Sequence, residues 1–62
     1  MNNMKLYRKE KNYTLKKLSE LTNISVGYLC HLEKGSRNNP SMHVLNKIAM
    51  ALDRSVEEVF FN

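Results

Sequence analysis

Apolar residues recur along the chain at the three- and four-residue spacing of an α-helix, and short polar segments separate them. The clearest stripe lies in the C-terminal half, where Leu45, Ile48, Ala49 and Leu52 share one helical face. The same pass along the chain finds helices and no strands. The pattern therefore predicts an all-α fold, a compact bundle of five short helices forming one domain over residues 1–62.

Four of the predicted helices begin after a hydroxyl residue that can cap a helix by accepting a backbone hydrogen bond. These N-caps are Thr14, Ser25, Ser41 and Ser55. Glu58 follows Ser55 by three residues, which is the spacing of a capping box. Asn23 and Gly35 tolerate the left-handed backbone that ends a helix. We therefore expect the second helix at about 14–22 and the third at about 25–34.

The apolar faces of these helices predict the core. Its expected members are Leu15, Leu18, Ile24, Leu29, Leu32, Leu45, Ile48, Ala49, Leu52 and Val56. Methionines most often fill gaps in a core or lie in a frayed terminus, and these are the places expected for Met1, Met4, Met42 and Met50. Phe60 and Phe61 are consecutive, so a short helix cannot bury both, and one of them should be exposed.

Size and composition exclude several classes of protein. A 62-residue chain cannot surround a deep substrate pocket, and it carries no recognisable catalytic constellation, so we expect no enzyme and no small-molecule ligand. No apolar run approaches the roughly 20 residues of a membrane span, and the N-terminus is not a signal peptide. The single cysteine, Cys30, excludes an internal disulfide and fits the reducing cytoplasm. The class of protein that is not excluded is a binding module that acts through its surface.

The net charge of +4 is unevenly distributed. Residues 1–37 hold eight basic and three acidic side chains, whereas residues 38–62 hold two basic and three acidic ones. A basic half beside a nearly neutral half indicates a polyanionic partner on one side of the molecule. By charge alone, the alternative is simply a well-solvated surface.

The most informative segment is 14–35, where two helices of about eight residues meet at a tight turn. It reads Thr-Leu-x-x-Leu-Ser-x-Leu-Thr-Asn-Ile-Ser-x-x-Tyr-Leu-x-x-Leu-Glu-x-Gly. Small Ser19 should let the helices cross closely, Asn23 should make the turn, and Ile24 should fill the angle between them. Leu29 and Leu32 should attach the third helix to the core. Its opposite side would then be free to enter a DNA major groove about 12 Å wide, with Val26, Gly27, Cys30, His31 and Lys34.

These residues resemble the Cro/C1-type helix-turn-helix regulators, also called the XRE family. The resemblance covers about residues 4–60. Besides segment 14–35 it includes Tyr7-Arg8-Lys9-Glu10-Lys11, the loop Gly35…Asn39-Pro40-Ser41, and Ile48-Ala49-x-Ala51-Leu52…Ser55-Val56…Val59-Phe60. It implies a sequence-specific regulator that binds double-stranded DNA, a repressor at a palindromic operator. The alternative is a protein-interaction or antitoxin-like module that uses the same fold.

The resemblance also implies roles for residues of this chain. The third helix would be the recognition helix, with base contacts from Val26, Gly27, Tyr28 and His31. Phosphate contacts would come from the start of the second helix, the cap and end of the third helix, and the loop after it. They are Thr14, Leu15, Lys16, Lys17, Ser25, Lys34, Ser36, Arg37, Asn38 and Asn39. Arg8 and Glu33 occupy positions that are often paired in the family, which implies a partly buried structural ion pair.

Two of the implied base contacts carry little chemistry. Val26 offers only apolar contact, for example to a thymine methyl group. Gly27 has no side chain, so either it lets the backbone approach DNA closely or it is simply tolerated near a helix start. Because Val26 and Gly27 can make few base-specific contacts, we hypothesise that Tyr28, His31 and Arg37 contribute more to recognition of the DNA sequence.

The remaining expectations concern partners and metals. In relatives the C-terminal end forms a two-fold dimer contact, which implies a homodimer through Val56, Phe60 and Phe61; a monomer with Phe61 folded back is the alternative. Cys30 and His31 are adjacent on a helix and point about 100° apart, and His43 should lie on the exposed side of the fourth helix. We therefore expect no metal and no cofactor. Cys30 is an inert thiol or, alternatively, a redox sensor close to DNA.

Overall fold

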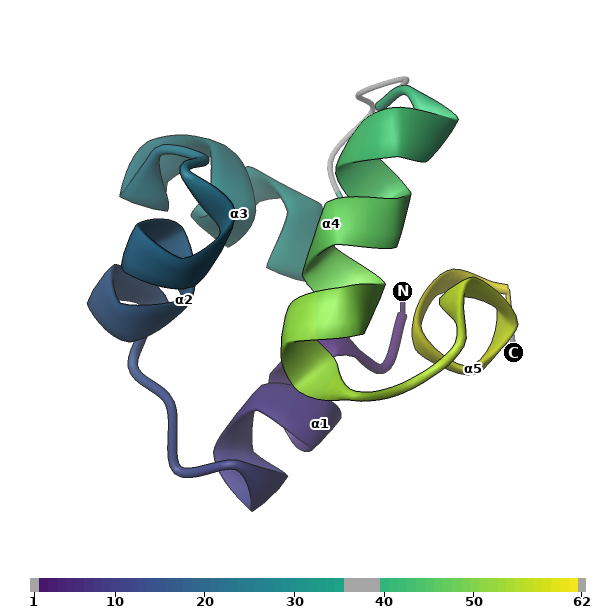
Figure 1. Ribbon diagram of the computed structural model, residues 1–62, viewed down its shortest axis with the longest axis horizontal. Coiled ribbons are helices and arrows are strands. Elements are labelled where there is room, and N and C mark those ends of the chain that lie inside the picture. The colour runs from purple at the N-terminus through teal and green to yellow at the C-terminus, as the bar shows by residue number, and fades with distance from the viewer. Residues whose placement is uncertain (1, 36–39, 62) are drawn as a thin grey trace.

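The computed structural model describes residues 2–35 and 40–61, and within them the chain forms five helices and no strand. They are α1 (Met4–Glu10), α2 (Leu15–Thr22), α3 (Val26–Glu33), α4 (Met42–Leu52) and α5 (Val56–Phe60). The longest, α4, runs through the middle of the molecule, with α2 and α3 on one side and α5 on the other (Figure 1). The predicted all-α architecture is confirmed. No helix in the described part is long and apolar enough to cross a bilayer.

Each predicted N-cap makes its capping hydrogen bond. The hydroxyl oxygens accept from the backbone N–H three residues on, at 3.0 Å for Thr14, 3.1 Å for Ser25, 3.2 Å for Ser41 and 3.1 Å for Ser55. The capping box is complete, because the Glu58 carboxylate accepts from the Ser55 N–H at 2.9 Å. The helices therefore begin where local side-chain chemistry satisfies N–H groups that have no partner within the helix.

Left-handed backbone ends the helices as expected. Asn23 closes α2 with φ of 61°, and Gly35 follows α3 with φ of 74°. Asp53 closes α4 in the same conformation with φ of 59°. Aspartate is among the residues that tolerate this region, since its short polar side chain can bond locally.

One hydrophobic core joins all five helices. Its largest fully buried side chains are Met4, Leu18, Leu29, Ile48, Leu52 and Val59. The prediction was wrong for Leu15, Ile24 and Val56, which are half-buried and pack against the core from its edge. These three residues lie at or next to helix starts, where the chain enters from the surface, and this explains their partial exposure.

The methionines divide between core and surface. Met4 is fully buried beneath the other helices, as a core methionine should be. For Met42 and Met50 the expectation of a core position or a frayed terminus was wrong, because both are exposed on α4 and Met50 keeps 80% of its surface. The buried stripe of α4 is already complete with leucine, isoleucine and alanine, so these two methionines fall outside it. Met1 lies outside the described residues.

Candidate nucleic-acid interface

The turn between α2 and α3 is held by side-chain hydroxyl groups as well as by Asn23. Ser19 Oγ donates to the carbonyl oxygen of Ile24 across the turn. Thr22 Oγ1 donates to the Leu18 carbonyl at 2.8 Å and accepts from the Ile24 N–H at 3.3 Å. The sequence assigned Ser19 a purely steric role and did not predict either hydroxyl contact. These bonds fix the angle at which α3 leaves α2.

The outer side of α3 is exposed, as its pattern predicted. Leu29 and Leu32 are buried beneath it, while Val26, Gly27 and His31 lie at the surface. Lys34, the C-cap residue, is also exposed. Every described residue of segment 26–34 that was assigned to DNA, apart from Tyr28, is therefore exposed at the surface.

Two residues of α3 lie at the border between the core and this outer side. Cys30 was expected on the free side, which is wrong, because it is half-buried directly after Leu29. Tyr28 was assigned a base contact, and it is half-buried with its side chain packed against the core. Tyr28 precedes buried Leu29 and lies one turn before buried Leu32, which draws its ring inward.

Gly27 has no packing partner that would require a glycine. A methyl group built at its Cα would meet nothing within 4 Å. The only described glycine with positive φ is Gly35, so Gly27 has ordinary backbone geometry in the first turn of α3. The free protein therefore offers no steric reason for the absence of a side chain here.

Exposed lysines lie at both ends of the two-helix segment. Lys16 and Lys17 lie exposed in the first turn of α2, where the helix dipole disfavours a cation. The first-turn N–H groups of Leu15 and Lys16 have no carbonyl acceptor within the helix. Lys34 is exposed at the end of α3. Among residues 2–35 and 40–61, none of these three lysines takes part in an ion pair. An external anion would be stabilised by both the lysines and the dipole.

Two basic residues near the end of α4, Lys11 and Arg54, are paired within the fold. Arg54 binds Glu10 at 3.0 Å and Glu58 at 3.4 Å, and its guanidinium lies 4.4 Å from the centre of the Tyr7 ring. Lys11 lies 3.7 Å from Asp53. Backbone hydrogen bonding from Ser55 lowers the pKa of Glu58 below its ordinary value of 4.5, with a smaller contribution from Arg54. The charges of Lys11 and Arg54 are thus partly neutralised by neighbouring carboxylates. Lys16, Lys17 and Lys34 have no such partner among the described residues.

Arg8 and Glu33 form the ion pair that the resemblance implied. The guanidinium donates twice to the carboxylate, through Nε to Oε2 and through Nη2 to Oε1. The side chains keep only 10% and 9% of their surface. Arg8 Nη1 also donates to the Tyr13 carbonyl at 2.7 Å. One arginine therefore connects α1, the segment before α2 and the end of α3.

The C-terminal end behaves as the consecutive phenylalanines predicted. Phe60 packs against the core together with Val56, whereas Phe61 keeps 64% of its surface. The loop residues assigned to phosphate, Ser36, Arg37, Asn38 and Asn39, lie outside the described residues.

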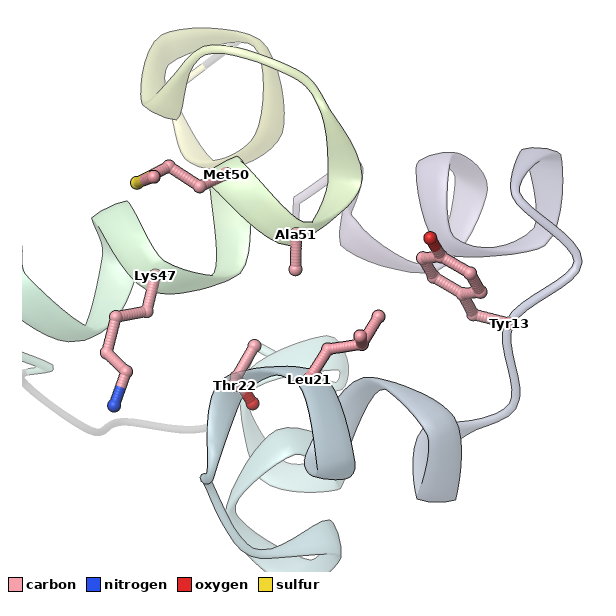
Figure 2. A pocket seen from close by; sticks show the side chains of 6 residues that line it. All are labelled: Tyr13, Leu21, Thr22, Lys47, Met50 and Ala51. Atoms are coloured by element: carbon pink, nitrogen blue, oxygen red, sulfur yellow. The ribbon is translucent and has the colours of Figure 1, made fainter.

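The structure also contains a shallow groove between α2 and α4, of about 380 Å³. Leu21 of α2 and Ala51 of α4 point toward each other across it, and Lys47 extends along its edge (Figure 2). None of its lining residues belongs to α3. The groove is therefore separate from the outer side of the third helix.

His43 is exposed on α4, as expected, and no three metal-ligating side chains gather within the described residues.

Comparison with known families and curated proteins finds helix-turn-helix proteins. The family model described as "Helix-turn-helix" matches residues 4–59. Among curated proteins, the HTH-type transcriptional regulator SinR of Bacillus subtilis (strain 168) is 42% identical over 53 residues, which are 86% of this chain and 48% of SinR. SlrR of the same organism is 35% identical over 57 residues, which are 92% of this chain and 38% of SlrR. The chain thus spans about half the length of these relatives or less.

Solved structures give the same result. The N-terminal DNA binding domain of SinR from Bacillus subtilis superposes with a TM-score of 0.80 at 40% identity, covering 89% of this chain and 80% of that one. A SinR protein/SinI protein complex gives a TM-score of 0.81 at 40% identity, covering 89% of this chain and 53% of the matched one. The similarity therefore extends over nearly the whole of this fold.

Proposed function

The chain belongs to the helix-turn-helix family, in its Cro/C1 form, and from this premise we propose that it is a sequence-specific, double-stranded DNA-binding regulator of transcription that represses from an operator. The observation that carries the proposal is the outer side of α3. It is exposed, it follows a turn held by two hydroxyl groups, and exposed lysines that pair with no described residue stand at both ends of the two-helix segment. Its relatives SinR and SlrR are HTH-type transcriptional regulators. The site of action would be the cytoplasm, where bacterial DNA is found.

The position of each side chain suggests whether it would contact bases or phosphates. Val26, Gly27 and His31 would meet base edges in the major groove, with the accessible part of Tyr28 at the border. The first turn of α2, with Lys16 and Lys17, and the end of α3, with Lys34, would bind phosphates. The remaining proposed phosphate contacts are Thr14, Leu15, Ser25, Ser36, Arg37, Asn38 and Asn39.

We further propose that the protein binds DNA as a homodimer through the C-terminal end. Exposed Phe61 lies beside half-buried Phe60, and together with Val56 they offer an apolar surface that a two-fold contact would cover. Two recognition helices about 34 Å apart would then match half-sites one DNA turn apart. Sedimentation of wild type and Phe61→Ser over a range of concentrations tests this. A wild type that stays monomeric on its operator would refute it.

Binding to DNA at two salt concentrations tests the main proposal. One duplex carries the promoter region upstream of the chain's own gene, and the other is a scrambled duplex of equal length. We expect tighter binding to the native duplex, and affinity that falls steeply with salt because several phosphates are neutralised at once. Equal, weak binding to both duplexes at every salt concentration would refute recognition of this operator.

Two variants separate phosphate contacts from base contacts. Lys16→Gln should weaken binding to both duplexes alike and reduce the salt slope by about one. His31→Ala should weaken binding to the native duplex by about 1–3 kcal/mol and leave the scrambled duplex nearly unchanged. A His31→Ala protein that binds as tightly and selectively as wild type would remove His31 from the recognition set.

A protein-interaction module is the second candidate function. The specific observation in its favour is that one similar structure is a complex of SinR with a second protein, SinI. No binding to either duplex, even at low salt, would favour this candidate over the first.

A further inference from the structure

The side chain of Asn2 connects the ends of two helices. Its Oδ1 accepts from the Met4 N–H at 3.0 Å, which caps the first turn of α1. Its Nδ2 donates to the carbonyl oxygen of Leu32 at 2.8 Å, 30 residues along the chain. Leu32 also accepts from the Gly35 N–H at 3.1 Å, so both lone pairs of this carbonyl are used. Asn2 thus holds the start of α1 and the last turn of α3 together.

This contact is adjacent to the Arg8–Glu33 ion pair. Leu32 and Glu33 are consecutive residues of the last turn of α3, and each is bound by a polar side chain from the N-terminal segment or α1. The two contacts differ in kind, since one holds the backbone and the other holds a side chain. Together they attach the C-terminal end of α3 to the N-terminal part of the chain.

The other end of α3 is fixed independently by the turn. Ser19 holds the Ile24 carbonyl, and Ser25 caps the first turn of α3. A helix of eight residues is about 12 Å long. Because each end has its own polar attachment, the tilt of α3 depends on both. His31 lies immediately before the residue that Asn2 holds, so a change of tilt would move it relative to a DNA groove.

We propose that Asn2 is a positioning residue for DNA recognition, which sets the tilt of α3 by holding the Leu32 carbonyl without itself contacting a base. The inference rests on the proposed function, since it assigns a role in the same recognition helix. It concerns selectivity between DNA sequences rather than general affinity, because a tilted helix loses base contacts while the lysines still reach phosphates.

The neighbouring residue supplies a matched control. Asn3 Nδ2 donates to the Glu58 carbonyl at 3.1 Å, so it makes the same kind of bond to α5 instead of α3. Asn2→Asp keeps the oxygen that caps Met4 and removes the donor to Leu32. Asn3→Asp removes the donor to Glu58 and adds the same charge one residue away. The two variants therefore differ in which helix they release.

The experiment measures binding of wild type, Asn2→Asp and Asn3→Asp to the native and scrambled duplexes at one salt concentration, well below the unfolding temperature of each protein. We expect the ratio of the two affinities to fall about fivefold in Asn2→Asp, the factor corresponding to one net hydrogen bond. The ratio should stay at the wild-type value in Asn3→Asp. An unchanged ratio in both variants, or an equal fall in both, would overturn the proposal.

A second measurement needs no DNA and separates this proposal from the function on which it rests. Amide hydrogen exchange in the last turn of α3 should be faster in Asn2→Asp than in wild type and unchanged in Asn3→Asp. If wild type binds both duplexes equally, the proposed function fails. Amide hydrogen exchange then shows by itself whether Asn2 stabilises the last turn of α3. Unchanged exchange would overturn the proposal. Should Asn2→Asp not fold, Asn2→Ser keeps a neutral capping oxygen and replaces it in both measurements.

Discussion

Replacing Gly27 with alanine should stabilise the free protein and weaken its binding to DNA. Gly27 lies in the first turn of α3 with ordinary backbone geometry, and an added methyl group would meet nothing within 4 Å. Alanine would therefore adopt the same conformation without strain. Two explanations of the glycine then remain: it lets the α3 backbone approach DNA closely, or it is tolerated near a helix start.

The size of the stabilisation follows from helix propensity. Glycine in a helix interior costs about 1 kcal/mol relative to alanine, largely through the entropy of the unfolded chain. Because Gly27 is only the second residue of α3, the gain should be about 0.5–1 kcal/mol. In a domain of this size this corresponds to a rise of roughly 2–8 °C in Tm. If the α3 backbone approaches a DNA groove closely, the same methyl group should cost about tenfold in affinity for the native duplex, roughly 1.4 kcal/mol.

Thermal unfolding and DNA binding of wild type and Gly27→Ala test the two parts together. A lower Tm for Gly27→Ala would refute the predicted stabilisation. It would mean that the added methyl group clashes with the protein, although nothing lies within 4 Å of it in the structure. A higher Tm with unchanged affinity for the native duplex would refute the close approach. Gly27 would then be merely tolerated at a helix start, the alternative that the sequence left open.

Three further predictions concern stability, each measured by urea denaturation. Arg8→Met should cost about 3 kcal/mol by leaving a buried carboxylate unpaired, and adding Glu33→Leu should recover part of that loss; a single variant as stable as wild type would contradict this. Ile48→Ala should cost about 2–4 kcal/mol and Met50→Ala less than about 0.5 kcal/mol, because only Ile48 is buried; equal costs would contradict the burial. The lowered pKa of Glu58 means that its contribution is present at neutral pH and is lost as the pH falls below about 4.5, so Glu58→Gln should flatten the acid side of the stability profile; an unchanged profile would contradict the capping role.

The starts of α2, α3 and α5 and the end of α2 follow from the local sequence alone. Thr14, Ser25 and Ser55 cap their helices in the structure as they do in the pattern, and Asn23 adopts the left-handed conformation. These features depend on hydrogen bonds between residues two to five positions apart, so the local sequence contains all the partners. The buried face of α4 and the exposure of one of two consecutive phenylalanines follow equally from helical periodicity.

How the helices are held against one another follows from contacts between residues far apart in the sequence. The contact between Asn2 and Leu32 spans 30 residues, and that between Asn3 and Glu58 spans 55. Met4 is fully buried while Met50 is exposed, although the two have the same side chain. The long-range contacts and the burial of Met4 depend on which distant element covers the residue, so the local sequence does not contain them. Burial and long-range hydrogen bonding are properties of the packed chain, and they set the position of α3 against the other helices.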